Sequence, residues 1–404
     1  MKPIFDMKGA VGEDSDPSLV WESTVHQALP AHVSDIHLLA RRDGTEIVYR
    51  IDGDMWSQGL IGPELARRVI SHVKSISGMD LAESRRPTEG RLLLEAGGRS
   101  VDLRVSVVPT LYGQDLVARV FDRRMSLLGL PDLGFLPEQL NYVNDMLTRP
   151  HGLILVCGPT GSGKTTSLYA MLQNLTGGVR KIMTIEDPIE YELDGVSQSQ
   201  VNARIGLGFD SLLKAVLRQD ADVIMVGEVR DEETAATALR AANAGKLVLA
   251  TTHATRASRA VESMLGLGVH PYWLAVALRG VMAQVLVKRV CPQCKQALPE
   301  TADMIVDDDI RARLRQRNIA RPQLHRGTGC DHCWGSGYRG RLGLFELFVP
   351  SEEITQLITG RRPAAEIDRA AAKAHLLSLE QSGKIAALEG LTTMEEIVAN
   401  VPMA

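Results

Sequence analysis

The sequence predicts an α/β protein with a doubly wound, mostly parallel sheet that follows a small α+β domain. Two observations carry this prediction. Residues 30–125 alternate apolar and polar side chains around short turn signals, as half-buried strands do. Beyond residue 138, nearly continuous apolar runs alternate with helical stretches, as strands buried on both faces of a parallel sheet do. The 404 residues are enough for two or three domains.

The small domain, residues 30–125, is expected to consist of hairpins and one helix. Residues 35–54 alternate on either side of Asp43-Gly44, a pair typical of hairpin turns. Residues 63–77 carry apolar side chains at helical spacing. Residues 101–121 alternate again and predict a second hairpin.

Composition sets the remaining boundaries. Residues 1–29 begin acidic, are rich in small residues and lack the apolar segment of a signal peptide, so they are predicted to be a disordered tail. Residues 126–137 are rich in Leu, Gly and Pro and are predicted to be a linker. The larger domain is expected to span residues 138–404, with a cysteine-containing subdomain at 291–333 and helices after it.

Charge and hydropathy exclude some classes of protein. The formal net charge is -4 and aromatic residues make up 4%, which argues against a broad basic surface or a base-stacking groove for nucleic acid. The chain contains no run of eighteen apolar residues, so a membrane span is not expected. Together with the absence of an export signal, this predicts a cytoplasmic location.

The strands of the larger domain are expected to end at one site. Four apolar runs predict them: Leu153–Val156, Ile182–Ile185, Val223–Val226 and Leu247–Ala250. Each run is followed by polar or glycine residues. Because ligands bind beyond the carboxyl ends of parallel strands, these four ends predict a single binding site.

The loop after the first run matches the phosphate-binding pattern G-x-x-x-x-G-K-[ST]. It reads Gly158-Pro159-Thr160-Gly161-Ser162-Gly163-Lys164-Thr165, and Thr166 follows. Its glycines let backbone N–H groups face the phosphates of ATP, while Lys164 is expected to reach the β- and γ-phosphates and Thr165 to bind Mg²⁺. The alternative is a glycine-rich loop that binds nothing. The apolar strand before this loop and the helical stretch after it favour phosphate binding.

The other strand ends carry candidate catalytic residues. Glu228 is expected to face Mg²⁺ or the attacking water. Glu186 is a candidate for orienting or deprotonating that water, although Asp187-Pro188 beside it also suits a simple turn. His253 is expected to sense the γ-phosphate, and the alternative is an ordinary core or surface histidine.

Four of the five cysteines form two C-x-x-C pairs, which are Cys291 with Cys294 and Cys330 with Cys333. Two such pairs suit a tetrahedral, structural Zn²⁺ site without an open position. The alternative is four reduced thiols without a metal. The fifth cysteine, Cys157, is expected to be a buried packing residue.

Two arginines of the small domain, Arg104 and Arg119, occupy polar strand positions. A guanidinium group can bind phosphate through a fork of N–H donors. The residues alone favour the simpler interpretation, which is an exposed face with salt bridges.

These segments together resemble the secretion ATPase family of type II secretion and type IV pilus assembly. The matching segments are Ser34–His37, Tyr49–Gly53, the phosphate loop, Thr184–Glu190, Leu217–Asp220, Gly227–Asp231, Thr251–His253 and Gly337–Arg341. The resemblance extends over residues 34–402. It implies a RecA-like P-loop NTPase core, a PAS-like small domain before it and a tetracysteine zinc insert.

The resemblance also implies how such a chain works. It implies a hexameric ring in which ATP lies between the core and the small domain, with Arg104 and Arg119 closing on the phosphates. Glu186 and Glu228 fall on the family's catalytic acids. An inner-membrane platform protein is the implied partner, and the chain would associate with the inner membrane only through it. The tetracysteine insert is similar to that of the branch that assembles or exports.

The chain departs from the family pattern in three places. Gly245-Lys246 replaces the usual Gly-His, and residues Thr252–Thr255 differ from the family's usual sequence around the histidine. The N-terminal docking region of many members is also absent, so a short form is expected. The alternatives are a DNA-handling conjugation or competence ATPase, and a nucleotide-binding scaffold without catalysis. The tetracysteine and Thr184–Glu190 segments favour the motor over the first of these, and the intact acids and Lys164 favour it over the second.

Overall fold

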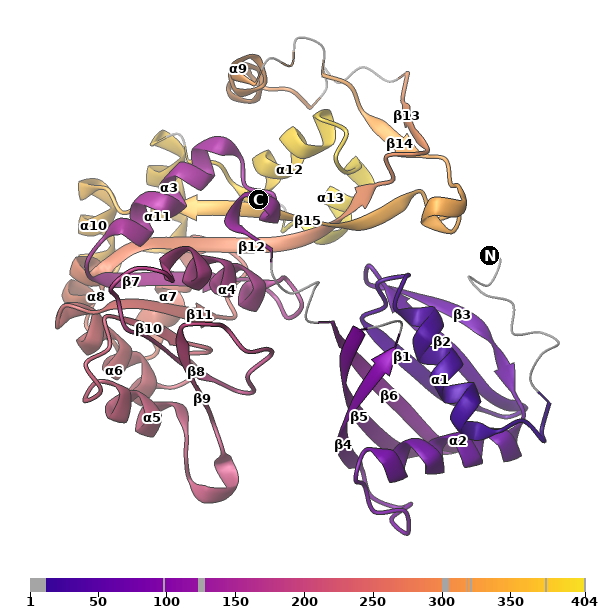
Figure 1. Ribbon diagram of the computed structural model, residues 1–404. Helices are drawn as coiled ribbons and strands as arrows, with labels where there is room; N and C mark the ends of the chain where they lie inside the picture. The colour runs from indigo at the N-terminus through magenta and orange to yellow at the C-terminus, as the bar shows by residue number, and fades with distance from the viewer. Residues whose placement is uncertain are drawn as a thin grey trace. The chain divides into compact units, whose positions relative to one another are not determined.

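A computed structural model describes residues 12–96, 99–122, 128–299, 305–317, 319, 322–374 and 376–402. The chain divides into two compact units, Met1–Ser126 and Leu127–Ala404 (Figure 1). Unit 1 mixes helices with an antiparallel sheet, and unit 2 contains a larger, mostly parallel sheet. The predicted fold class is thereby confirmed.

Unit 1 is a six-stranded antiparallel sheet against which two helices pack (Figure 1). The strand order is β3-β2-β1-β6-β5-β4. The predicted hairpins correspond to β1–β2 and β5–β6, and the predicted helix corresponds to α2. The bounds of the elements are α1 Pro17–Ala28, β1 Asp35–Arg41, β2 Gly44–Ile51, β3 Asp54–Ile61, α2 Pro63–Ile76, β4 Thr88–Ala96, β5 Arg99–Thr110 and β6 Gly113–Asp122.

Helix α1 corrects the prediction that residues 1–29 form a disordered tail. Residues 1–11 lie outside the described residues, but residues 17–28 are helical. Asp16 caps this helix by accepting a hydrogen bond from the N–H of Ser18 at 2.8 Å, and a proline occupies its first turn. Trp21 and Val25 are buried, so apolar burial fixes α1 in the core of unit 1.

Unit 2 is built on a seven-stranded sheet in the order β15-β12-β7-β11-β10-β8-β9, in which only β15 is antiparallel to its neighbour. The strands are β7 Gly152–Cys157, β8 Ile182–Glu186, β9 Val196–Gln200, β10 Val223–Val226, β11 Leu247–Thr252, β12 Leu278–Val290 and β15 Tyr338–Phe348. A separate two-stranded sheet pairs β13 Lys295–Ala297 with β14 His325–Gly327.

The helices of unit 2 surround this sheet (Figure 1). They are α3 Pro137–Thr148, α4 Lys164–Leu175, α5 Phe209–Val216, α6 Glu232–Asn243, α7 Ala257–Gly266, α8 Pro271–Ala277, α9 Asp308–Gln316, α10 Glu352–Thr359, α11 Ala364–Lys373, α12 Leu379–Leu388 and α13 Met394–Asn400, with 3₁₀ turns at Leu130–Leu133, Ala203–Ile205 and Asp331–Cys333. Within the described ranges, every helix is too short or too polar to cross a bilayer.

The central strands of unit 2 are buried on both faces. In β7, Leu153 and Leu155 belong to the core on the side of α5, α6 and α7, whereas Ile154 and Val156 belong to the core on the side of α3 and α4. Successive side chains of a strand point to opposite faces, so both must be apolar here. This explains the continuous apolar runs in the sequence.

The predicted linker, residues 126–137, is only partly a connector. Leu130 and Leu133 lie in a 3₁₀ turn and are buried in the core of unit 2 beside α3 and α4. Leu136 is buried in a second cluster with α9 and α12. These apolar residues of the predicted linker anchor the segment to unit 2.

A buried hydroxyl tests the docking of α1. Tyr49 of β2 is fully buried, and its hydroxyl donates to the backbone carbonyl of Thr24 in α1 at 2.6 Å. We expect Tyr49→Phe to lower the free energy of unfolding of unit 1 by about 1 kcal/mol, the usual net value of such a hydrogen bond. Chemical denaturation monitored by circular dichroism measures this.

Tyr112→Phe is the matched control, since Tyr112 lies in the β5–β6 turn with 57% of its surface exposed. Its denaturation midpoint is expected to equal that of the wild type. Equal midpoints for Tyr49→Phe and Tyr112→Phe would contradict the docking of α1 through this bond.

Candidate active site

The phosphate loop connects the end of β7 to the start of α4, as the sequence predicts. Gly158, Gly161 and Gly163 have φ values of 151°, 79° and 86°, which favour glycine. A Cβ atom on Gly158 would lie 2.3 Å from the backbone oxygen of Gln284 in β12. No side chain caps α4 at Gly163, so the first N–H groups of the helix are left for a ligand. This is the arrangement that binds phosphate at a helix N-terminus.

Lys164 opens α4 and folds back onto the loop. Its ammonium group donates to the backbone oxygens of Gly158 at 2.7 Å and Pro159 at 3.0 Å. Burial lowers the pKa of Lys164, and the negative charge of Glu228 acts in the opposite direction. Thr165 and Thr166 follow in the first turn of the helix and are half-buried.

Glu228 lies just beyond the carboxyl end of β10 and contacts the guanidinium group of Arg230 and the imidazole of His253. Its Oε1 accepts a hydrogen bond from Arg230 Nε at 2.5 Å and also contacts His253 Nε2. Burial acts to raise the pKa of Glu228, but the hydrogen bonds from Arg230 and His253 outweigh burial and hold the pKa below its ordinary value. Glu228 is therefore ionised at neutral pH.

Backbone hydrogen bonds fix the segment that carries Glu228. The N–H of Gly227 donates to the carbonyl of Ile185 in β8 at 2.8 Å, and the N–H of Val229 donates to the carbonyl of Thr251 in β11 at 3.0 Å. Thr251 returns its hydroxyl to the carbonyl of Gly227. The segment is thus tied to strands on both sides, which places Glu228 and His253 at the same edge of the sheet.

Glu186 ends β8 and faces a different set of groups. The side chain is buried and accepts hydrogen bonds from Tyr169, from Thr184 at 2.6 Å and from Gln198 at 3.0 Å. These donors belong to α4, β8 and β9. The structure therefore gathers Lys164, Glu228 and His253 into one electrostatic cluster, and it holds Glu186 in a neighbouring buried network.

Arg104 and Arg119 lie directly opposite each other on β5 and β6 of unit 1. Arg119 is exposed, and its Nε donates to Asp35 of β1 at 3.0 Å. The guanidinium of Arg104 stacks 4.4 Å from the ring centroid of Phe121. Guanidinium groups on two facing strand positions can together bind an anion such as phosphate.

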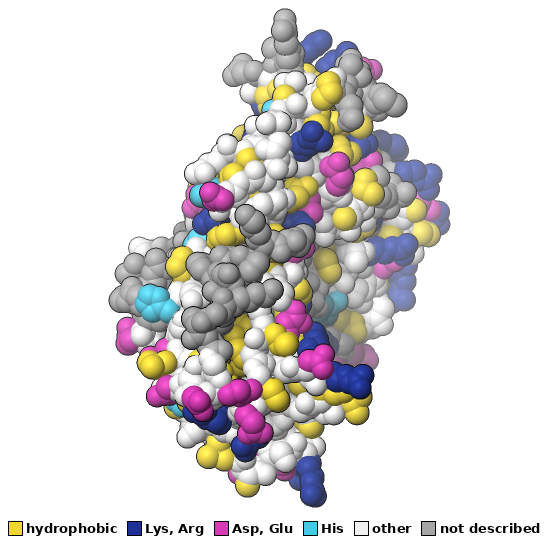
Figure 2. All heavy atoms as spheres, turned by 90° about the vertical axis from the view of Figure 1, so that its right-hand side faces the viewer, with side chains coloured by type: hydrophobic (Ala, Val, Ile, Leu, Met, Phe, Trp, Pro, Cys, Tyr) yellow, Lys and Arg dark blue, Asp and Glu magenta, His cyan; other side chains and the backbone are white. Residues whose placement is uncertain are grey.

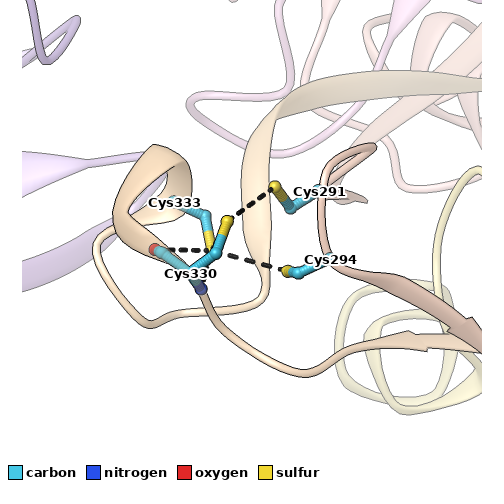
Figure 3. A group of neighbouring side chains, drawn as sticks. All are labelled: Cys291, Cys294, Cys330 and Cys333. Atoms are coloured by element: carbon cyan, nitrogen blue, oxygen red, sulfur yellow. Dashed lines mark hydrogen bonds between the residues drawn. The ribbon is translucent and has the colours of Figure 1, made fainter.

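The four cysteines of the two C-x-x-C pairs converge at one point (Figure 3). Their sulfur atoms all lie within 4.8 Å of one another, and neighbouring pairs are separated by 3.7 or 3.8 Å. Zinc bound to four thiolates at about 2.3 Å requires sulfur–sulfur distances of about 3.8 Å. The geometry of the cluster therefore fits tetrahedral zinc.

Backbone groups around the cluster also suit a thiolate. The N–H groups of Cys330 and Gly337 each donate to Cys333 Sγ at 3.2 Å. Burial raises the pKa of the Cys333 thiol, but these hydrogen bonds outweigh burial and lower it to about 7. Cys157 lies apart from the cluster, buried in the core at the end of β7, as predicted.

Several groups around the site were not predicted from the sequence. Tyr169 and Gln198 bind Glu186, and Gln284 donates to the carbonyl of Ser162 in the phosphate loop at 2.6 Å. The one signal for Gln284 in the sequence is its amide within the apolar run Val281–Val287. Tyr169 and Gln198 carry no such signal, because their roles depend on tertiary contacts.

Comparison with known proteins agrees with this geometry. Residues 12–399 match the family model described as type II/IV secretion system protein. The chain is 40% identical over 389 residues to type II secretion system protein E of Pseudomonas aeruginosa, covering 96% of this chain and 76% of the relative. It is 38% identical over 381 residues to the type IV pilus assembly ATPase PilB of Thermus thermophilus, covering 94% of this chain and 42% of that protein.

Solved structures show the same fold. The pilus retraction motor PilT with bound ADP superposes with a TM-score of 0.64 at 24% identity, covering 94% of this chain and 96% of PilT. The ATPase DotB of Legionella pneumophila gives a TM-score of 0.71 at 18% identity, covering 96% of this chain and 98% of DotB. At these identities the likeness concerns the fold alone, but the sequence matches go further: the chain belongs to the type II/IV secretion system protein family.

Proposed function

We propose that this chain is an ATPase motor that powers protein secretion or pilus assembly. Membership of the family carries the class of activity, which is ATP hydrolysis. The observation that carries the site is the ionised Glu228, which Arg230 and His253 hold at the edge of the sheet where the phosphate loop begins. A carboxylate near a phosphate-binding loop can orient the water that attacks the nucleotide.

Residues 158–166 bind the phosphates of ATP in this proposal. Backbone N–H groups of the loop and the start of α4 face the phosphate oxygens, and Lys164 exchanges its two carbonyl contacts for the β- and γ-phosphates. Thr165 and the ionised Glu228 hold Mg²⁺, since both offer the oxygen ligands that this ion prefers. The ion neutralises phosphate charge.

Glu228 orients the attacking water and accepts its proton. Arg230 and His253 hold the carboxylate in place and keep it ionised. Catalysis of phosphoryl transfer consists mainly of positioning and charge neutralisation, which these groups supply. His253 lies within contact of Glu228, so it reports on the state of this acid and, through it, on the γ-phosphate.

We assign Glu186 a supporting part in the same reaction. Its three side-chain donors tie α4 to β8 and β9, so the acid sets the position of the helix that begins at Lys164. Glu186 is buried, so direct catalysis by this acid would require water to reach a carboxylate with 3% of its surface exposed. Glu228 is only partly buried, which makes it the preferred acid for contact with water.

Arg104 and Arg119 complete the proposed site from unit 1. Asp35 engages Arg119 through Nε, and 64% of the Arg119 side chain is exposed. Two guanidinium groups on facing strand positions can together bind an anion, and the γ-phosphate of ATP is such an anion. Closure of unit 1 on bound ATP, followed by release after hydrolysis, is the proposed power stroke.

The proposed assembly is a hexamer that works with an inner-membrane platform protein from the cytoplasmic side. The names of the relatives, a type II secretion protein and a pilus assembly ATPase, support this setting. On the face drawn in Figure 2, basic and acidic side chains are interspersed, which favours a protein partner over DNA. Salt-sensitive DNA binding by the purified chain would revive the conjugation alternative.

The tetracysteine cluster is proposed to hold one structural zinc ion. Its sulfur spacing and the N–H donors to Cys333 support this. Four protein ligands leave no open position, so the ion would stabilise the region around β13 and β14 and take no part in hydrolysis.

ATP turnover tests the proposed site and assembly. We expect Mg-ATP turnover per chain to rise with protein concentration, because the proposed active form is an assembled ring. Lys164→Ala and Arg119→Ala are each expected to reduce turnover by about 100-fold or more, since phosphoryl transfer depends on such charges. Arg67→Ala, at an exposed position of α2, is the matched control and should keep wild-type turnover.

Wild-type turnover by Arg119→Ala would contradict a role for this arginine in the site. Turnover per chain that does not change with protein concentration would contradict the need for an assembled ring.

Metal analysis tests the zinc site. Protein purified without chelators is expected to contain about one zinc per chain, the number that a four-cysteine site holds. Cys294→Ser and Cys333→Ser should lose the ion and lower the thermal unfolding midpoint. Cys157→Ala, which removes the cysteine outside the cluster, should retain it. Far less than one zinc in the wild type would refute the site.

A further inference from the structure

Gln284 is a buried amide in an otherwise apolar strand. It lies in β12 with 1% of its surface exposed, between Ala283 and Val285 of the hydrophobic core. Residue Ala283 pairs with Cys157, the last residue of β7. Gln284 is therefore the first residue of β12 beyond this pairing, level with the point where the phosphate loop begins.

The phosphate loop packs directly against this residue. A Cβ atom on Gly158 would lie 2.3 Å from the backbone oxygen of Gln284, and one on Gly163 would lie 3.3 Å from its Nε2. The first and the last glycine of the loop thus both face Gln284. Between them, the side-chain amide donates to the carbonyl of Ser162 at 2.6 Å.

This hydrogen bond fixes the direction of one peptide unit. In a planar trans peptide, the carbonyl of one residue and the N–H of the next point in opposite directions. Holding the Ser162 carbonyl toward β12 therefore turns the N–H of Gly163 away from β12. Gly163 is the residue before Lys164, and its N–H is among those that a phosphate loop offers to its ligand.

The burial of Gln284 is unfavourable unless it serves this purpose. Among the residues that the structure describes, its Oε1 has no hydrogen-bond partner, and the neighbouring Ser162 Oγ has none either. Buried polar atoms without partners destabilise a fold, and an apolar side chain of the same size would avoid one of them. A glutamine at this position is explained by what its Nε2 does to the loop.

We infer that Gln284 is a positioning residue for nucleotide binding, which holds the Ser162–Gly163 peptide so that the Gly163 N–H faces the phosphates. The inference rests on the proposed ATP site. It predicts that losing the amide weakens phosphate binding specifically and does not merely loosen the fold.

The test is the affinity for Mg-ADP by titration calorimetry, together with the thermal unfolding midpoint. Gln284→Leu removes the donor at nearly equal volume, and we expect the Kd to rise about three- to thirty-fold through loss of one buried hydrogen bond and its orientation. The Kd of Gln284→Asn for Mg-ADP should rise as well, because this variant keeps an amide but is shorter by one methylene. Lys164→Ala provides the reference for lost phosphate binding.

Gln139→Leu is the matched control. Gln139 of α3 is also a buried glutamine, and its Nε2 donates to the carbonyl of Phe345 at 2.7 Å and to Ser382 at 3.2 Å, within unit 2 and outside the phosphate loop. Its loss should lower the unfolding midpoint, because two buried hydrogen bonds are removed, and leave the Kd for Mg-ADP unchanged.

Wild-type affinity in Gln284→Leu would overturn the inference while leaving the ATP site intact. An equal loss of affinity in Gln139→Leu would overturn it too, because the effect would then be general loosening. If Gln284→Leu does not fold, Gln284→Asn decides by the same criteria. Failure of the wild type to bind Mg-ADP would overturn the proposed function itself together with this inference.

Discussion

Burial of the central strands on both faces is the constraint on which the rest of the structure depends. β7, β8, β10 and β11 are covered by apolar cores on either side, so most of their side chains are apolar. Most of the polar groups lie where the strands end. Since the strands are parallel, these ends lie at one edge of the sheet, and the phosphate loop, Glu228 and His253 meet there.

Hydrogen bonds from neighbouring strands fix the loops at this edge of the sheet. Hydrogen bonds from Gly227 to β8 and between Val229 and Thr251 of β11 fix Glu228, while Gln284 of β12 fixes the phosphate loop. Each charged group is thus positioned by a strand other than its own. Groups held in advance in this way need little rearrangement during the reaction, which is how electrostatic catalysis becomes effective.

Much of the fold and the first contacts of the site could be predicted from local patterns. The four apolar runs, the phosphate loop and the paired cysteines are contiguous in the sequence, so spacing alone identifies them. Helix α1 was not predicted, because a short acidic segment hides its two anchors, Trp21 and Val25, although Asp16 and the proline after it are recognisable start signals.

Contacts between distant segments could not be predicted. The network around Glu186 depends on Gln198 of β9, and the phosphate loop depends on Gln284, more than a hundred residues further along the chain. A pattern can place an acid at a strand end, but it does not show which groups the carboxylate faces. The structure shows that Glu228 faces Arg230 and His253, whereas Glu186 is held by neutral donors.

The central claim is that Glu228 is the acid that acts on water, and single-turnover hydrolysis of Mg-ATP by Glu228→Gln tests it most directly when ATP affinity is measured beside it. The account predicts that the variant binds ATP and loses the rate of hydrolysis by about 100-fold or more, as expected when a general base is removed. Glu233→Gln, at an exposed position in the first turn of α6, should behave as the wild type. Wild-type hydrolysis by Glu228→Gln would contradict the account and return the catalytic role to Glu186.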